Sequence, residues 1–232
     1  MELTLNKVIK FIKQNWITIV VILVVLYLVY YFLFLFKHVK DIDKVYEIPN
    51  FLTPEECQHI IKLAEPNLKR SEVIAAGGSE VDSIRTSQQA WLNEPDDPVI
   101  KKISDLAIEY TGLPTENQEE LQVLRYHKGQ EYRPHYDACH PDKDSNCKED
   151  IKKGGLRYAT VIVYLNDSFE DGGTIFPNRN YTVKPKTGKV AIFYNLKPDN
   201  SFPSEKSLHG GEPVKNGTKW MCNFWIRLNK IP

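Results

Sequence analysis

The triplet His135-Tyr136-Asp137 contains two side chains that could bind the same metal ion. In an extended segment successive side chains point to opposite sides, so His135 and Asp137 would share one side and Tyr136 would face the other. The same pair could also arise by chance on a surface strand, and two ligands alone make a poor metal site. The triplet therefore predicts a metal centre only if a further ligand comes from elsewhere in the chain.

His209 is the candidate for this third ligand. It ends a short apolar run and precedes a Gly-Gly pair that we expect to form a turn, and a late strand carrying it could pair back to the strand of His135. Two histidines and one carboxylate around a metal with open positions are typical of non-heme Fe(II) oxygenases. The other histidines lie near the apolar N-terminal run, in a helical segment or beside the triplet, where they are less suitable: His38, His59, His127 and His140.

Lys219 opens the last strongly β-like run of the chain, ten residues after His209. A lysine that points into an apolar barrel is costly unless an anion neutralises it. The carboxylate of an anionic cosubstrate would meet that need, whereas the alternative is an ordinary lysine at a strand edge.

The elements that must position these residues fall into two groups. Residues 53–64 and 97–111 have helical patterns, and the first begins with Thr53 and Glu56 as a capping box and Pro54 at the first helical position. The second group consists of four runs rich in β-branched and aromatic residues: LQVLRYH, LRYATVIVYLN, KVAIFYN and TKWMCNFWIRL. Helices followed by many strands predict an α+β domain with a sandwich or barrel of sheets.

The composition is that of a globular domain, with 42% apolar and 26% charged residues. The 30 basic and 30 acidic residues balance, so no basic stripe indicates a nucleic-acid partner. Residues 75–83, rich in Gly and Ser, are expected to form a mobile loop, and the charged run KEDIKK at 148–153 a solvated loop. No separate partner-binding domain is visible, and we expect a monomer.

Four blocks of the sequence, in order, resemble the collagen-type prolyl 4-hydroxylases, which are 2-oxoglutarate- and Fe(II)-dependent dioxygenases. The resemblance covers residues 48–228 and is greatest to the small prolyl 4-hydroxylases of algae and of viruses that infect them. It implies a double-stranded β-helix (jelly-roll) core flanked by helices. It also implies hydroxylation of proline in proline-rich or collagen-like peptides with O2 and 2-oxoglutarate, which releases succinate and CO2. The blocks are VLRYHKGQEYRPHYD, GGLRYATVIVYLND, DGGTIFP and LHGGEPVKNGTKWMCNFWIR.

The resemblance further implies a role for each site residue. His135, Asp137 and His209 would bind Fe(II), and Lys219 would pair with the distal carboxylate of 2-oxoglutarate. L-ascorbate would restore iron that becomes oxidised in uncoupled turnovers. Residues 75–87 would form a lid over the peptide. The remaining positions, each of which could instead be an ordinary core residue, would hydrogen-bond 2-oxoglutarate (Tyr126, Thr174) or line the peptide pocket (Tyr132, Arg157, Trp225, Arg85).

Two other functions remain open from the sequence. One is a 2-oxoglutarate-dependent protein hydroxylase with a different target residue, including the oxygen-sensing kind, although those relatives usually carry Arg where Lys219 stands. The other is a non-catalytic binding domain on the same fold, which the intact set of ligands and Lys219 disfavours.

Residues 17–36, ITIVVILVVLYLVYYFLFLF, contain no charge, no Gly and no Pro. About 20 such residues are what an α-helix needs to cross the hydrocarbon core of a bilayer. The sequence therefore predicts a tail at 1–16, one N-terminal transmembrane helix at 17–36, a linker at 37–46 and a dioxygenase catalytic domain at 47–232.

Lysines flank the apolar run on both sides, so their distribution does not decide the orientation. Cys139 and Cys147 bracket a polar loop and could form a disulfide in an oxidising compartment, whereas Cys57 and Cys222 fit core positions. Three sequons, at Asn166, Asn180 and Asn216, also agree with a lumen. We therefore expect a single-pass membrane protein whose catalytic domain lies in the lumen of the endoplasmic reticulum.

Overall fold

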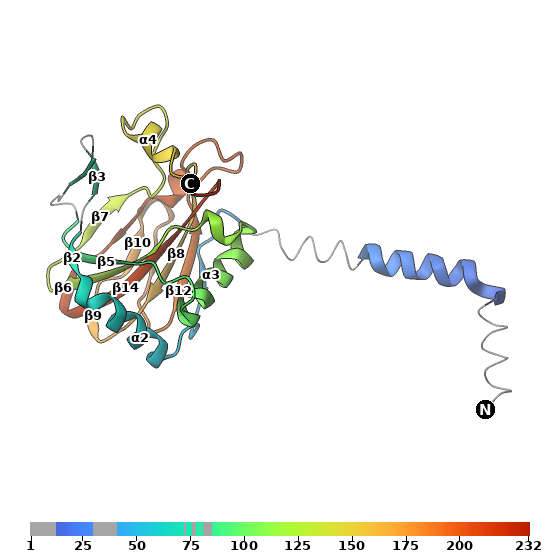
Figure 1. The fold of residues 1–232 in the computed structure, drawn as a ribbon, viewed down its shortest axis with the longest axis horizontal. Coiled ribbons are helices and arrows are strands. Elements are labelled where there is room, and N and C mark those ends of the chain that lie inside the picture. The colour runs from blue at the N-terminus through green and yellow to red at the C-terminus, as the bar shows by residue number, and fades with distance from the viewer. Residues whose placement is uncertain (1–12, 30–40, 72, 76–77, 81–84) are drawn as a thin grey trace. The chain divides into compact units, whose positions relative to one another are not determined.

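The computed structural model describes residues 13–29, 41–71, 73–75, 78–80 and 85–232 (Figure 1). The chain forms two compact units, residues 1–41 and residues 42–232, which we describe separately.

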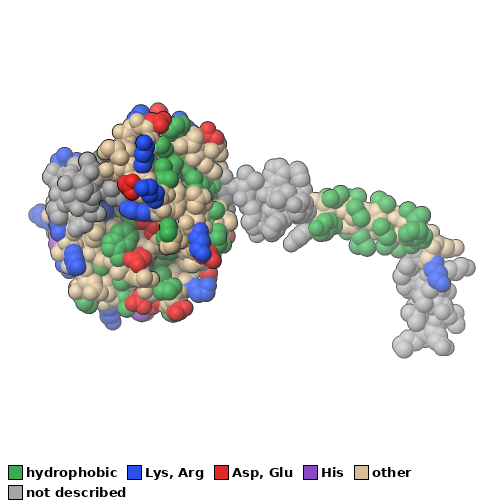
Figure 2. Space-filling view, turned by 45° about the horizontal axis from the view of Figure 1, so that its top comes forward, with side chains coloured by type: hydrophobic (Ala, Val, Ile, Leu, Met, Phe, Trp, Pro, Cys, Tyr) green, Lys and Arg blue, Asp and Glu red, His purple; other side chains and the backbone are tan. Residues whose placement is uncertain are grey.

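Residues 13–29 of the first unit form a helix whose surface is largely hydrophobic (Figure 2). Within the part of the chain that the structure describes, no helix is both long and apolar enough to cross a membrane. Residues 30–36 of the predicted span 17–36 lie outside the described residues. The predicted transmembrane helix is therefore not confirmed.

The two predicted helices of the second unit are confirmed. Helix α2 (Pro54–Ala64) begins with the expected capping box, in which the Thr53 hydroxyl accepts from the Glu56 amide and the Glu56 carboxylate accepts from the Thr53 amide. Helix α3 (Pro98–Thr111) begins at Asp97, whose carboxylate accepts two backbone N–H bonds, and ends at Gly112 with φ +71°. Shorter helices are α4 (Cys147–Ile151) and the 3-10 turns η1 (Glu65–Asn67), η2 (Thr115–Asn117), η3 (Pro177–Arg179) and η4 (Glu205–Ser207).

The largest sheet contains eight antiparallel strands, among them the four predicted runs at β6, β8, β12 and β14. Its order along the sheet is β1-β12-β8-β14-β6-β5-β2, and β9 also pairs with β14. The strands are β1 (Tyr46–Ile48), β12 (Val190–Tyr194), β8 (Arg157–Tyr164), β14 (Val214–Arg227), β6 (Leu121–His127), β5 (Gln88–Leu92), β2 (Lys69–Arg70) and β9 (Phe169–Asp171).

A second antiparallel sheet has the order β11-β10-β13-β7. Its strands are β11 (Tyr181–Val183), β10 (Thr174–Phe176), β13 (His209–Gly211) and β7 (Tyr132–His135). Two further strands, β3 (Val73–Ala75) and β4 (Gly78–Glu80), pair with each other.

Three local predictions differ from the structure. In the expected loop at 75–83, residue 75 ends β3 and residues 78–80 form β4. Its other residues lie outside the described part of the chain. Gly210 and Gly211 belong to strand β13 and not to a turn. The KEDIKK run contains most of helix α4, and its Asp150 is buried because it pairs with a buried arginine.

Strand alternation divides the core of the second unit into two layers. On β14, Cys222, Phe224 and Ile226 pack with α2 and α3 in one layer, whereas Met221 packs between the two sheets. The helices thus cover one face of the large sheet, and the second sheet covers the other (Figure 1). The α+β prediction is confirmed, and the two antiparallel sheets are consistent with the expected jelly-roll core.

Gly188 ties the segment after β1 to the turn before β12. Its carbonyl accepts hydrogen bonds from the amides of Phe51 and Leu52 at 2.8 and 3.1 Å, and its amide donates to Tyr164. Its φ is +74°, and a Cβ at this position would overlap the carbonyl oxygen of Leu52. Glycine is therefore required here both for backbone conformation and for space.

We expect Gly188→Ala to lower the free energy of unfolding by about 3 kcal/mol, because positive-φ strain adds to a backbone overlap. Gly112→Ala is the matched control, since Gly112 has φ +71° but no atom within 4 Å of its Cβ position, and it should cost only about 1 kcal/mol. Denaturant unfolding of both variants measures the difference. Equal losses would contradict the close approach at Gly188.

Candidate metal centre and active site

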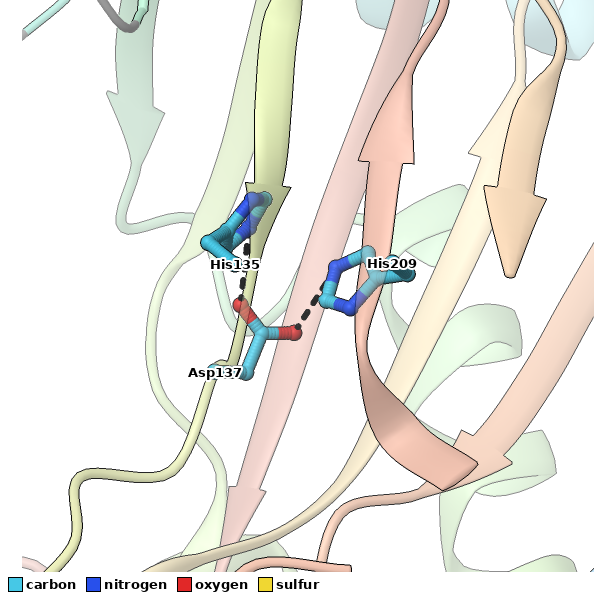
Figure 3. Close-up of side chains that lie close together, drawn as sticks. All are labelled: His135, Asp137 and His209. Carbon is cyan, nitrogen blue, oxygen red and sulfur yellow. Dashed lines mark ion pairs between the residues drawn. The ribbon is translucent and has the colours of Figure 1, made fainter. Parts of the chain in front are cut away.

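The second sheet brings the three predicted metal ligands together. Strands β7 and β13 pair so that His135 lies directly opposite His209, and Asp137 follows β7 with its carboxylate between the two rings (Figure 3). The Asp137 oxygens lie 3.6 Å from Nε2 of His135 and 3.5 Å from Nε2 of His209. One ligand atom from each residue lies within 4.8 Å of the others, which is close enough for one ion to contact all three.

Both histidines are held in the tautomer that a metal requires. Nδ1 of His135 lies 2.8 Å from the carbonyl oxygen of Arg133, and Nδ1 of His209 lies 2.9 Å from that of Ser207. Because a carbonyl oxygen can only accept, each Nδ1 carries the proton and each Nε2 presents a lone pair towards Asp137. Backbone carbonyls are the usual outer partners of metal-binding histidines.

Asp137 is oriented by the large sheet. Its Oδ2 accepts a hydrogen bond from the Thr160 hydroxyl at 2.6 Å, and that hydroxyl oxygen accepts from Asn195 at 2.9 Å. Burial raises the pKa of Asp137, but the neighbouring His209 and His135 outweigh burial and leave the pKa below its usual range. Burial lowers the pKa of His209 to about 4. An ionised Asp137 carboxylate and a neutral His209 imidazole are protonation states that suit Fe(II) binding.

The close approach of β13 to β7 explains the glycine after His209. A Cβ on Gly210 would lie 2.9 Å from both the Pro134 nitrogen and the Tyr132 carbonyl oxygen, tighter than ordinary packing permits. Glycine at this position therefore lets the two strands approach and keeps the two histidines opposite each other.

Lys219 lies on the inward face of β14 and is only 1% exposed. Its Nζ donates to the carbonyl oxygen of Gly172 at 2.7 Å and lies 5.2 and 5.7 Å from the ring centroids of Tyr126 and Tyr164. Among the described residues no carboxylate forms an ion pair with it, and burial lowers its pKa to about 7. The Glu212 carboxylate acts on this amine electrostatically without forming an ion pair, and a buried amine of this kind is suited to an anionic ligand.

The two other residues expected to contact 2-oxoglutarate lie around Lys219. Tyr126 is 3% exposed and faces its amine. The Thr174 hydroxyl is 2.6 Å from the Tyr164 hydroxyl, and both groups are buried. The amine thus lies beside the rings of Tyr126 and Tyr164, and the Tyr164 hydroxyl contacts Thr174.

A pocket of about 1210 Å³ opens beside His135 and Asp137. All four residues predicted for the peptide pocket line it: Tyr132, Arg157, Trp225 and Arg85. The Tyr132 ring stacks on His135 with centroids 3.6 Å apart. The Arg85 guanidinium lies 4.8 Å from the Tyr132 centroid and donates to Gln122 at 2.7 Å.

Arg157 and Trp225 form a second wall of this pocket. The Arg157 guanidinium lies 3.8 Å from the Trp225 ring centroid and makes two hydrogen bonds of 2.7 Å to Glu119. Cys139 and Cys147, which also line the pocket, are joined by a disulfide, whereas Cys57 and Cys222 are free and buried.

Sequence reasoning missed several residues that support the site. Thr160 and Tyr164 share a face of β8, so the alternation within ATVIVY was a usable signal. Glu119 and Arg227 come from segments 108 residues apart, and Asn195 follows a strand end. No local sequence pattern indicates that Glu119, Arg227 and Asn195 support the site.

Comparisons with known proteins agree with this geometry. The model of the 2OG-Fe(II) oxygenase superfamily matches residues 121–227. A protein of Acanthamoeba polyphaga mimivirus, named as a candidate prolyl 4-hydroxylase, is 39% identical over 189 residues, which cover 82% of this chain and 76% of that protein. Prolyl 4-hydroxylase 2 of Arabidopsis thaliana is 37% identical over 218 residues, covering 84% of this chain and 71% of that protein.

A solved structure is similar over most of the second unit. It is the viral collagen prolyl hydroxylase of Paramecium Bursaria Chlorella virus-1 in complex with 2OG, with a TM-score of 0.61 and 31% identity. The similarity covers 78% of this chain and 94% of the viral one. With the sequence matches, it shows that this chain belongs to the prolyl 4-hydroxylases of the 2OG-Fe(II) oxygenase superfamily.

Proposed function

We propose that this chain is a peptidyl-prolyl 4-hydroxylase acting on proline-rich or collagen-like peptides with O2 and 2-oxoglutarate, and that succinate and CO2 are released. The observation that carries the proposal is the convergence of His135, Asp137 and His209 in a domain that also buries Lys219, which forms no ion pair among the described residues. Family membership supports the same reaction.

Each residue has a specific task in this proposal. His135, Asp137 and His209 hold Fe(II), which supplies the activation of dioxygen when bound. Lys219 pairs with the distal carboxylate of 2-oxoglutarate, and the hydroxyls of Tyr126 and Thr174 hydrogen-bond the same group. The apolar residues between the two sheets keep water from this ion pair and so strengthen it.

The peptide is proposed to bind in the pocket beside His135. Tyr132 and Trp225 offer aromatic surfaces to the target proline, and Arg85 and Arg157 offer cationic groups to backbone carbonyls. An extended, proline-rich chain suits an aromatic-lined groove because its polyproline II conformation costs little entropy to fix. L-ascorbate is the expected reductant for iron oxidised without substrate turnover, and a monomer is the expected active form.

Residues 42–232, which form one compact unit, are expected to add one oxygen to proline in a proline-rich peptide in the presence of Fe(II), 2-oxoglutarate and L-ascorbate. His135→Ala or Asp137→Ala should lower this activity at least about a hundredfold, because an iron ligand is removed. Mass spectrometry of the peptide measures the gain and locates it.

His127→Ala is the matched control, since His127 is exposed and lies at the end of β6, away from the three ligands. It should keep the activity of the unmodified protein. Undiminished hydroxylation by the His135 or Asp137 variant would refute the ligand assignment. Oxygen gained on another residue would favour a protein hydroxylase with a different target.

Lys219→Ala is expected to raise the 2-oxoglutarate requirement on the order of 30- to 1000-fold, the cost of truncating one partner of a buried charge pair. Fe(II) binding should be nearly unchanged, because Lys219 is not a ligand. Lys215→Ala, an exposed lysine on the same strand, serves as control. Equal turnover of the Lys219 variant and the unmodified protein at low 2-oxoglutarate would contradict the role of Lys219.

The pH dependence of 2-oxoglutarate binding follows from the pKa of Lys219, which burial lowers to about 7. Below this pH the amine is already charged, so binding needs no proton. Above it, pairing with a carboxylate requires proton uptake, and the affinity should fall about tenfold per pH unit. Calorimetry with Mn(II) in place of Fe(II) measures the slope, and Lys219→Arg should abolish it because Arg stays charged.

The apolar run at 17–36 supports a further proposal, a membrane anchor with the catalytic domain, 47–232, in the lumen of the endoplasmic reticulum. The Cys139–Cys147 disulfide supports an oxidising compartment. The full chain expressed in cells should stay with membranes in alkaline carbonate and be protected from added protease. Release by carbonate would refute the anchor, and digestion in sealed vesicles would refute the lumenal orientation.

A further inference from the structure

Four charged side chains form a continuous network along one wall of the pocket. Arg157 makes two hydrogen bonds to Glu119, and Oε1 of Glu119 also accepts from Nε of Arg227 at 2.7 Å. Arg227 in turn bonds both carboxylate oxygens of Asp150, at 3.0 and 3.3 Å. The order along the network is therefore cation, anion, cation, anion, and Arg227 at its centre is 1% exposed.

One end of the network lies at the wall expected to receive the peptide. Arg157 lies over the ring of Trp225 at 3.8 Å, and its direction is fixed by the two bonds to Glu119. Glu119 is itself tied to the strand, because its amide donates to the carbonyl oxygen of Trp225 at 2.9 Å. The buried Nε1 of Trp225 has no hydrogen-bond partner among the described residues.

The other end of the network lies on α4. This helix has only five residues and is joined at its first residue to Cys139 by the disulfide from Cys147. Arg227 bonds the backbone carbonyls of Asp150 and Gly155 as well as the Asp150 carboxylate. The placement of α4 against β14 thus depends on these bonds and on the disulfide.

The charge of Asp150, at the α4 end of the network, affects Arg157 at the pocket because Arg227 and Glu119 link the two residues. With Asp150 present, two carboxylates balance the two arginines. Glu119 then directs both oxygens to Arg157, although Oε1 also accepts from Arg227. Without the Asp150 charge, two buried arginines compete for Glu119, and an uncompensated buried cation is costly. Glu119 would then shift towards Arg227, and Arg157 would lose its fixed position over Trp225.

We propose that Asp150 and Arg227 are positioning residues for the peptide substrate, acting through Glu119 on Arg157 and Trp225. Segment 139–155, which contains the disulfide-closed loop 139–147, is thereby coupled to the peptide wall of the pocket. Neither Asp150 nor Arg227 contacts substrate in this arrangement. The proposal rests on the proposed prolyl hydroxylation and adds to it a determinant of peptide affinity that lies outside the iron and 2-oxoglutarate sites.

The test is Asp150→Asn in the full chain loaded with Fe(II), a change that keeps the side-chain size and removes the charge. The KM for a proline-rich peptide should rise about tenfold. The 2-oxoglutarate requirement and the slow peptide-free turnover of 2-oxoglutarate should stay as in the unmodified protein. A merely structural role would lower all of these activities together, and that result, or an unchanged peptide KM, would overturn the proposal.

Glu149→Gln is the matched control, because Glu149 is the preceding residue of α4 but is exposed and pairs with Lys152 at the surface. It should behave as the unmodified protein. A double variant, Cys139→Ser with Cys147→Ser, removes the tether of α4 without changing any charge and should also raise the peptide KM. If Asp150→Asn does not fold, an unchanged KM in this double variant overturns the proposal.

A measurement without substrate separates this proposal from the proposed function. The Nε–H of Arg157, which bonds Glu119, should exchange slowly with solvent in NMR spectra of the unmodified protein. Asp150→Asn should speed that exchange about tenfold, whereas Glu149→Gln should not. If no peptide is hydroxylated, the proposed function fails, and the exchange rates still decide the coupling: equal rates overturn it.

Discussion

The two-residue period of β14 is the constraint on which the rest of the structure depends. One face of this strand packs against α2 and α3, and the other faces the space between the sheets. The inward face carries Lys219 and Trp225, six residues and therefore roughly 20 Å apart along the strand. Strand β14 therefore contributes both the lysine of the proposed 2-oxoglutarate site and a tryptophan of the proposed peptide pocket. A shift of one residue in register would turn both side chains towards the helices.

Burial of charge is the energetic consequence of placing this chemistry between two sheets. The pKa of Asp137 lies below its usual range because its interactions with His209 and His135 outweigh the effect of burial, and its carboxylate also accepts from the Thr160 hydroxyl. Arg157 is stabilised by Glu119. Lys219 differs, since burial weakens its charge and, among the described residues, no carboxylate pairs with it. A binding site for an anion is the arrangement in which such a lysine becomes favourable.

The features of the fold that depend on local sequence pattern could be predicted from the sequence. Both helices followed from capping residues and apolar spacing, and the four long strands from their β-branched runs. The pair His135 and Asp137 followed from strand alternation. The pattern around His209 indicated only that its strand could pair with that of His135, and the resemblance implied the complete ligand set, because pairing between strands 74 residues apart leaves no local signal. Glu119, Arg227 and Asp150 were missed for the same reason. The KEDIKK segment looked solvated because Arg227, the buried partner of its Asp150, is remote in sequence.

The metal centre lies at the junction of the two sheets, and this explains why its ligands are not all on one strand. His135 and His209 belong to the second sheet, whereas Asp137 accepts its hydrogen bond from Thr160 on the large sheet. Gly210 allows the strands of the two histidines to approach closely enough. A divalent cation held by these residues would therefore join the two sheets as well as serve the chemistry, and its binding free energy would add to the stability of the fold.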